Sequence, residues 1–129
     1  MELLLFYQSA GQAAGCRLES GLAQLSFTKK VEVFRNIAGL AARLRHPADG
    51  LTAIILAASR QELQELQTIR SLLSKARVFL LVGDEEEETI ALAHRLRPRF
   101  LGYLNANYRE IFAVLVKLLE QHINLPYQV

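Results

Sequence analysis

The stretch LTAIILA, residues 51–57, decides the fold of this 129-residue chain. It is almost entirely apolar and shows no polar–apolar alternation, which is typical of a strand buried on both faces of a parallel sheet. The runs 3–7, 78–82 and 100–104 have the same character. The run 31–34, VEVF, alternates instead, as expected of a half-exposed edge strand. The sequence therefore predicts five strands.

Between these runs the apolar residues recur with the period of a helix. The helical stripes lie within 14–25, 37–44, 63–73, 90–96 and 111–119. Three helix starts have the spacing of a capping box, namely Ser59 with Glu62, Asp84 with Glu87, and Asn107 with Glu110. Pro98 ends the fourth helix just before the last strand. Strands and helices thus alternate five times.

Strict alternation of strands and helices predicts an α/β fold, because right-handed crossovers place helices on both faces of a parallel sheet. We expect a flavodoxin-like (βα)5 three-layer sandwich with strand order 2-1-3-4-5. The length fits one domain over residues 1–122, followed by a tail at 123–129. Ligands of such sheets bind at the carboxyl ends of the strands, so the loops there are the first candidates for function.

Composition excludes several classes of protein. The 15 basic and 13 acidic residues give a net charge of +2, and the basic residues are scattered along the sequence, which does not indicate nucleic-acid binding. No apolar run approaches the roughly 18 residues of a membrane span, and the N-terminus lacks the features of a secretory signal. The single cysteine excludes an internal disulfide and a cysteine-based zinc cluster. A cytoplasmic protein is expected.

Two segments carry a resemblance to a known family. The run 53–57, AIILA, is followed downstream by Leu66 and Arg70, and the run 102–108, GYLNANY, leads into the last helix. These segments resemble the receiver domain of bacterial response regulators, the second being similar to that family's Tyr-Leu-Thr-Lys-Pro-Phe segment. The resemblance extends over essentially the whole chain and implies the same fold.

The departures from the receiver pattern bear on function. Receivers hold Mg²⁺ with an acidic pair after the first strand, where this chain has Gln8 and Ser9. Their acceptor aspartate falls on Ala57, their Ser or Thr after the fourth strand on Gly83, and their lysine on Ala106. Phosphoryl transfer to a carboxylate needs the nucleophile, the divalent cation and a nearby positive charge. The resemblance therefore implies a degenerate receiver with no catalytic residue, metal or cofactor.

Other features have plainer interpretations. His94 is expected on the surface of a helix, and the acidic run 84–88 as the solvated first turn of one. The segment that contains Gly11 and Gly15 lacks the lysine of a P-loop. These two glycines instead predict close packing of the first helix on the sheet. Cys16, on the same helix, is expected to be buried and without a chemical role.

If the switch chemistry is absent, the surface carries the function. Receivers commonly pair through their fourth helix, fifth strand and fifth helix. The residues of that region here are Arg95, Arg97, Arg99, Tyr103, Tyr108 and Glu110. Arginine and aromatic side chains are typical of interface hot spots, so a symmetric homodimer is one hypothesis and an ordinary solvated surface is the other.

The sequence favours a non-catalytic receiver-like signalling module that binds a protein, such as a signalling kinase or effector. The alternative is a small-molecule-binding regulatory domain that uses the crevice at the carboxyl ends of the strands. Enzymatic activity is not expected, because no nucleophile–base pair maps to the loops after the strands.

Overall fold

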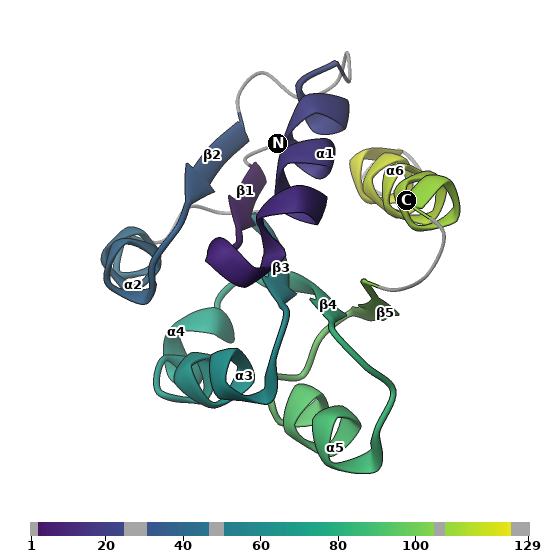
Figure 1. The fold of residues 1–129 in the computed structure, drawn as a ribbon. Coiled ribbons are helices and arrows are strands. Elements are labelled where there is room, and N and C mark those ends of the chain that lie inside the picture. The colour runs from purple at the N-terminus through teal and green to yellow at the C-terminus, as the bar shows by residue number, and fades with distance from the viewer. Residues whose placement is uncertain (1–2, 25–30, 47–50, 105–107, 125–129) are drawn as a thin grey trace.

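The computed structural model describes residues 3–24, 31–46, 51–104 and 108–124, which form a five-stranded parallel sheet between two layers of helices (Figure 1). The strands are β1 (Leu3–Phe6), β2 (Val31–Phe34), β3 (Thr52–Ala57), β4 (Arg77–Val82) and β5 (Phe100–Tyr103). Their order in the sheet is β2-β1-β3-β4-β5, and each neighbouring pair runs parallel. This confirms the predicted flavodoxin-like α/β fold.

The central strand is β3, which is hydrogen-bonded to β1 on one side and β4 on the other. All six of its residues are at most 1% exposed, which explains why its sequence is apolar without alternation. Both faces of the sheet are covered by helices (Figure 1). Ile55 and Leu80 point to one core, while Ile54 and Leu81 point to the other.

The helices divide between the two faces according to the core that each one completes. The first core is covered by α2 (Ile37–Leu44), α3 (Arg60–Gln67), α4 (Arg70–Leu73) and α5 (Glu87–Arg95), and the second by α1 (Gln12–Ala23) and α6 (Tyr108–Asn124). A short 3-10 turn, η1 (Ser9–Gly11), leads from β1 into α1. In the described part of the chain, no helix is both long and apolar enough to span a bilayer.

The helix expected over 63–73 is divided into α3 and α4. At Thr68 and Ile69 the backbone N–H groups donate to carbonyls three residues back, those of Glu65 and Leu66, which tightens the chain into a turn. The apolar spacing continues through this turn because Leu66, Ile69 and Leu73 all stay buried. The prediction of one continuous helix was therefore wrong, but the side of the segment that was expected to be buried is buried.

The predicted helix starts have different outcomes. Ser59 caps α3, since its hydroxyl accepts a hydrogen bond of 3.2 Å from the Glu62 N–H. Asp84 does not cap α5; its carboxylate accepts from the Glu86 N–H at 2.9 Å and shapes the turn before the helix. Asn107 lies outside the described residues.

The first helix lies very close to β1. A Cβ atom on Gly15 would come within 2.3 Å of the Tyr7 ring, so only glycine lets the helix approach this strand. This confirms the expected packing role of the residue. The expectation for Cys16 was wrong, because its side chain is exposed. It follows Gly15 by one residue and so leaves the helix face that Leu18 and Leu22 bury.

Candidate functional site

The loops that follow β1, β3 and β4 meet at one edge of the sheet, the carboxyl edge. Gln8 is half-buried and Ser9 is exposed between β1 and α1, Ala57 is the fully buried last residue of β3, and Gly83 follows β4. The structure brings these four sequence-predicted positions to one edge. The fifth, Ala106, lies outside the described residues.

Backbone atoms lie close together in the middle of this edge. A Cβ atom on Gly83 would lie 2.3 Å from the carbonyl oxygen of Ala58 and 3.0 Å from its carbon. From the other side, a Cβ atom on Gly11 would meet the Ala58 methyl group at 3.8 Å, an ordinary contact. Ala58 therefore sits between the loops after β1 and β4, and its backbone is within contact distance of the next loop.

The carboxylate nearest to the end of β3 along the chain is already used. Glu62 is only 8% exposed, and its Oε1 accepts a hydrogen bond of 3.0 Å from the Ala58 N–H. Together with the Ser59 cap, this ties the first turn of α3 back onto the loop. Gln8, across the edge, has a buried Nε2 without a hydrogen-bond partner among the described residues.

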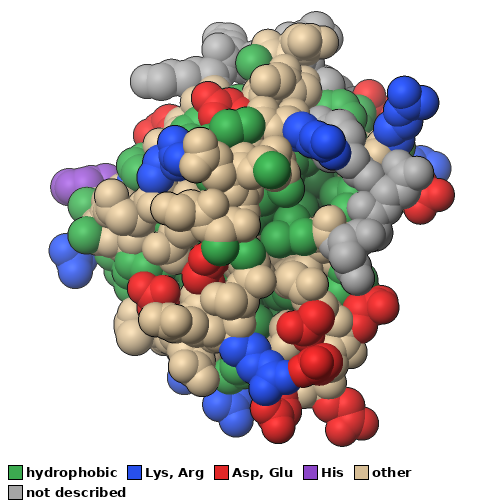
Figure 2. Space-filling view, viewed as in Figure 1, with side chains coloured by type: hydrophobic (Ala, Val, Ile, Leu, Met, Phe, Trp, Pro, Cys, Tyr) green, Lys and Arg blue, Asp and Glu red, His purple; other side chains and the backbone are tan. Residues whose placement is uncertain are grey.

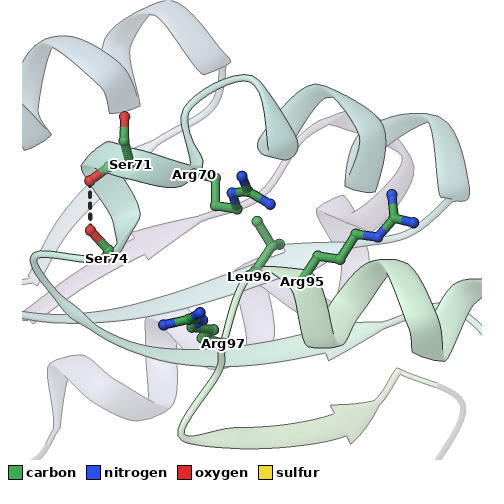
Figure 3. Close-up of a pocket in the computed structure, with 6 residues that line it drawn as sticks. All are labelled: Arg70, Ser71, Ser74, Arg95, Leu96 and Arg97. Atoms are coloured by element: carbon green, nitrogen blue, oxygen red, sulfur yellow. Dashed lines mark hydrogen bonds between the residues drawn. The ribbon is translucent and has the colours of Figure 1, made fainter.

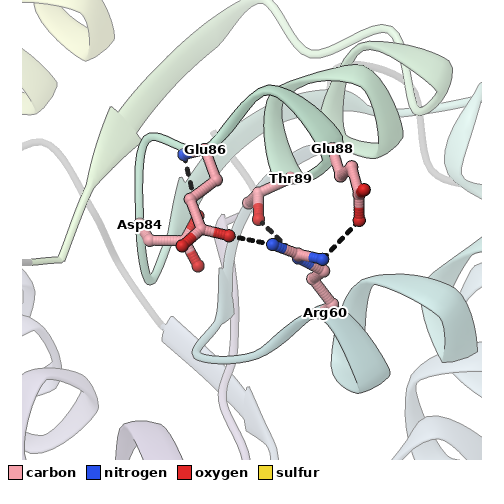
Figure 4. A network of polar contacts seen from close by, with 5 residues as sticks. All are labelled: Arg60, Asp84, Glu86, Glu88 and Thr89. Carbon is pink, nitrogen blue, oxygen red and sulfur yellow. Dashed lines mark hydrogen bonds and ion pairs between the residues drawn. The ribbon is translucent and has the colours of Figure 1, made fainter.

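Arg60 connects the start of α3 to the start of α5. Its guanidinium forms ion pairs with Glu86 and Glu88 and donates from Nε to the buried hydroxyl of Thr89 at 3.3 Å (Figure 4). Figure 2 shows acidic side chains gathered over the part of the surface where α5 lies. Only Glu87 and Glu88 of the acidic run lie in the first turn of α5, because the helix begins at Glu87 and the residues before it form a turn. Residues 85–88 are exposed, as expected, and the carboxylates of Glu86 and Glu88 form ion pairs with Arg60.

A second polar cluster surrounds Tyr7, which the sequence did not single out. The phenol is 1% exposed, donates to Glu19 Oε1 at 3.0 Å and lies 3.7 Å from the Cys16 sulfur. The Arg35 guanidinium stacks over its ring, 4.7 Å from the ring centre. Burial, followed by the contacts with Cys16 and Glu19, raises the pKa of Tyr7 to about 12, while the charge of Arg35 opposes this shift. The sequence signal that could have identified this cluster is a tyrosine directly after a fully apolar strand.

The residues of the predicted interaction face are spread over both the amino and the carboxyl edge of the sheet. Arg95 and Arg97 lie at the end of α5 and Arg99 precedes β5, whereas Tyr103 is the last residue of β5. The residues Arg95, Arg97 and Arg99 line pockets at the edge where the strands begin, and Glu110 is exposed on α6. The side chain of Tyr108 lies outside the described part. His94 is exposed on α5, as expected.

Within the described residues, no group of three or more His, Cys, Asp or Glu side chains is placed to hold a metal ion. The candidate site at the carboxyl edge thus consists of small residues, one buried amide and carboxylates engaged by an arginine and by backbone N–H groups.

The fold is similar to that of a response regulator receiver protein from Dyadobacter fermentans. The two structures align with a TM-score of 0.57 over 89% of this chain and 96% of the other, at 13% sequence identity. No protein-family model and no curated protein matches the sequence. The likeness is therefore one of fold, and it agrees with the receiver-like arrangement of strands and helices described above.

Proposed function

We propose that this chain is a receiver-like signalling module that has kept the fold and lost phosphoryl transfer, and that it acts by binding a protein partner. The contact between Gly83 and the Ala58 carbonyl is the observation that carries the proposal. By the resemblance, a receiver's acceptor aspartate falls on Ala57 and its Ser or Thr on Gly83, so this contact joins the loops that follow those two positions. Here β3 ends in Ala57, and the backbone of the following residue, Ala58, lies against the loop after β4.

The charges at this edge support the same proposal. Transfer of a phosphoryl group to an aspartate needs a free carboxylate, a divalent cation and a positive group near the phosphoryl oxygens. Glu62 holds a backbone N–H, and Glu86 and Glu88 pair with Arg60. These three carboxylates beside the edge thus have structural partners.

Incubation with acetyl phosphate and Mg²⁺, followed by mass spectrometry of the intact protein, tests the loss of phosphoryl transfer. We expect no added phosphoryl group, while a receiver that carries the acceptor aspartate gains one under the same conditions. Beryllofluoride with Mg²⁺ is expected to leave the amide resonances of Ala57, Ala58 and Gly83 unchanged. A phosphoryl adduct on the loop after β3, or shifts centred on these amides, would contradict the proposal.

For the protein-binding surface we propose α5, β5 and α6. β5 is at the end of the sheet, with β4 as its neighbour, so one side of its backbone is open to pairing. Val114 on α6 is 41% exposed and is the exposed large apolar residue among those described. The simplest occupant is a second copy of the chain, related by a twofold axis.

Light scattering after size exclusion tests this dimer across a range of concentrations. Val114→Glu is expected to shift a dimer toward monomer, while Ala42→Glu on the exposed side of α2 introduces the same charge away from the proposed surface. A monomer at high micromolar concentration, or equal effects of the two substitutions, would contradict the dimer.

A second candidate function rests on Gln8. Its buried Nε2 has no partner among the described residues, and such a donor favours a polar ligand at the carboxyl edge. A small-molecule regulator would show a rise in melting temperature with its ligand in a metabolite screen, and Gln8→Leu would remove this rise. The same rise in the Gln8→Leu variant would contradict a ligand at this position.

A further inference from the structure

Basic side chains gather at the amino edge of the sheet, where the parallel strands begin. Among the described residues, two pockets of about 250 and 240 Å³ open there and share Ser74. The first is lined by Arg70, Ser71, Ser74, Arg95, Leu96 and Arg97 (Figure 3). The second adds the cations Lys75, Arg77 and Arg99. None of the described residues that line the two pockets is acidic.

The sequence analysis treated the basic residues as scattered, and along the chain they are. Folding brings together six of the 15, because α4, the turn before β4, the end of α5 and the start of β5 meet at this edge. The +2 net charge therefore conceals a local gathering of basic side chains among the described residues. We call the two pockets together the amino-edge pocket.

Stabilisation of helix ends accounts for only part of this charge. α4 and α5 both end at the amino-edge pocket, with Ser74 and Leu96 as their C-caps. The C-terminus of a helix carries about half a negative charge, so two helices supply about one. Arg77 has an interaction of its own, and the five other cations still exceed that by roughly four. Mutual repulsion opposes this arrangement, and the charge of Arg99, after burial, lowers the pKa of Arg77.

Arg97 occupies a backbone position that favours another residue. Its φ is 52°, in the left-handed region, directly after the C-cap of α5. Glycine is the usual residue there because it has no Cβ to strain the backbone. A strained residue that lines a pocket points to a function of its side chain. The strain at Arg97 and the unbalanced charge are independent observations on the same pocket.

We propose that the amino-edge pocket binds a small ligand that carries at least two phosphate groups. The planar guanidinium of arginine donates two parallel hydrogen bonds to a phosphate, and five of the six cations are arginines. Two pockets side by side accommodate one phosphate each. The site lies at the opposite edge from the loops of the carboxyl edge and does not depend on the loss of phosphoryl transfer, although its Arg95 belongs to α5, which the proposed protein-binding surface includes.

The shape of the site favours an oligophosphate or a nucleotide over a nucleic-acid strand. Both pockets are concave, and the described residues that line them include no aromatic side chain. Proteins that bind single strands stack the bases on aromatic rings along an extended groove. A compact ligand whose phosphates provide the main contacts fits the amino-edge pocket better.

Titration calorimetry with tripolyphosphate, ATP and a short single-stranded RNA, all at one ionic strength, tests the proposal on the whole chain. Tripolyphosphate or ATP is expected to bind, and Arg70→Gln with Arg97→Gln to weaken that binding by at least about tenfold, since a charge-assisted hydrogen bond contributes about 1.5–3 kcal/mol. The control combines Arg17→Gln with Arg45→Gln, which removes the same charge from exposed positions outside the two pockets and outside the proposed protein-binding surface. It is expected to change affinity by less than about threefold, as for screened surface charges.

Several results would overturn the proposal: no binding of either phosphate compound, equal weakening in both double variants, or tighter binding of RNA than of tripolyphosphate. Amide shifts on the unmodified protein give a second readout that does not depend on the folding of a variant. Tripolyphosphate is expected to shift the amides of residues 70–77 and 95–99. Shifts centred elsewhere would refute the site.

Discussion

Gly83→Ala is a direct test of how closely the two loops approach at the carboxyl edge. The new methyl group would lie 2.3 Å from the Ala58 carbonyl oxygen. Real Cβ atoms essentially never approach another heavy atom within 3.0 Å, so the backbone must move by at least about 0.7 Å, the difference between the two distances. Neither group is the end of a side chain that could rotate away.

The cost follows from two opposing effects. Forced repacking of a buried region costs about 1–3 kcal/mol, and the contact adjoins the fully buried register pair Ala57 and Val82. Replacement of glycine by alanine also restricts the unfolded chain, which returns about 0.4–1 kcal/mol. From the middle of each range, about 2 and 0.7 kcal/mol, the free energy of unfolding should fall by about 1.3 kcal/mol. Each kcal/mol lowers Tm by roughly 3–6 °C for a chain of this length.

Urea unfolding followed by circular dichroism measures the change, with Gly11→Ala as the matched control. At Gly11 the nearest atom, the Ala58 methyl, lies 3.8 Å from the added Cβ, so the same chemical change meets ordinary contact. The control is expected to lose less than about 0.5 kcal/mol, as for substitutions that create no overlap. Equal stability of Gly83→Ala and the unmodified chain, or equal losses in both variants, would refute the closeness of the loops.

Four further predictions concern single residues elsewhere. Gly15→Ala should destabilise α1 against β1 by about 1–3 kcal/mol in urea unfolding, because the Tyr7 ring lies where the methyl would be; an unchanged midpoint would contradict this packing. Tyr7 should ionise near pH 12, so its contribution to stability is present below pH 10 and lost as pH rises from 10 to 12, and Glu19→Gln should lower the pKa in a phenolate absorbance titration. Ser59→Ala should cost about 0.5–2 kcal/mol through loss of the α3 cap, measured by thermal unfolding, and no loss would argue against that hydrogen bond. Arg97→Gly should raise stability by up to about 1 kcal/mol while it weakens phosphate binding, and a fall in stability would argue against strain at this residue.

The sheet could be predicted because its signal is local. The run 52–57 is apolar throughout because both faces of its strand are covered, and the alternation of 31–34 marked one edge of the sheet. The equally apolar run that forms β5 was misleading, since β5 is the other edge strand and is only half-buried. The layered order then followed from the handedness of the crossovers. Interruptions within helices were harder to predict, since Thr68 and Ile69 keep the apolar spacing of a continuous helix while the backbone tightens.

The candidate sites depend on contacts between distant segments, which the sequence alone does not give. Spacing identified Gln8, Ala57 and Gly83 as loop positions, but the contact of Gly83 with Ala58 joins two crossovers. In the acidic run 84–88, spacing alone pointed to Asp84 as the cap, which it is not, and nothing local distinguished Glu86 and Glu88 as the partners of Arg60. Cys16 comes one residue after the buried Gly15 on the same helix, and this rotation about the helix axis is enough to expose its side chain.

Charges of opposite sign gather at the two edges of the sheet in this nearly neutral protein. Five of its 13 acidic residues lie in the run before and within α5, and six of its 15 basic residues line the amino-edge pocket. At low ionic strength such a molecule turns its positive end toward an approaching anion, which accelerates encounter and weakens with added salt. It should also be retained on both cation- and anion-exchange resins near neutral pH, because the basic amino edge binds the first resin and the acidic start of α5 binds the second.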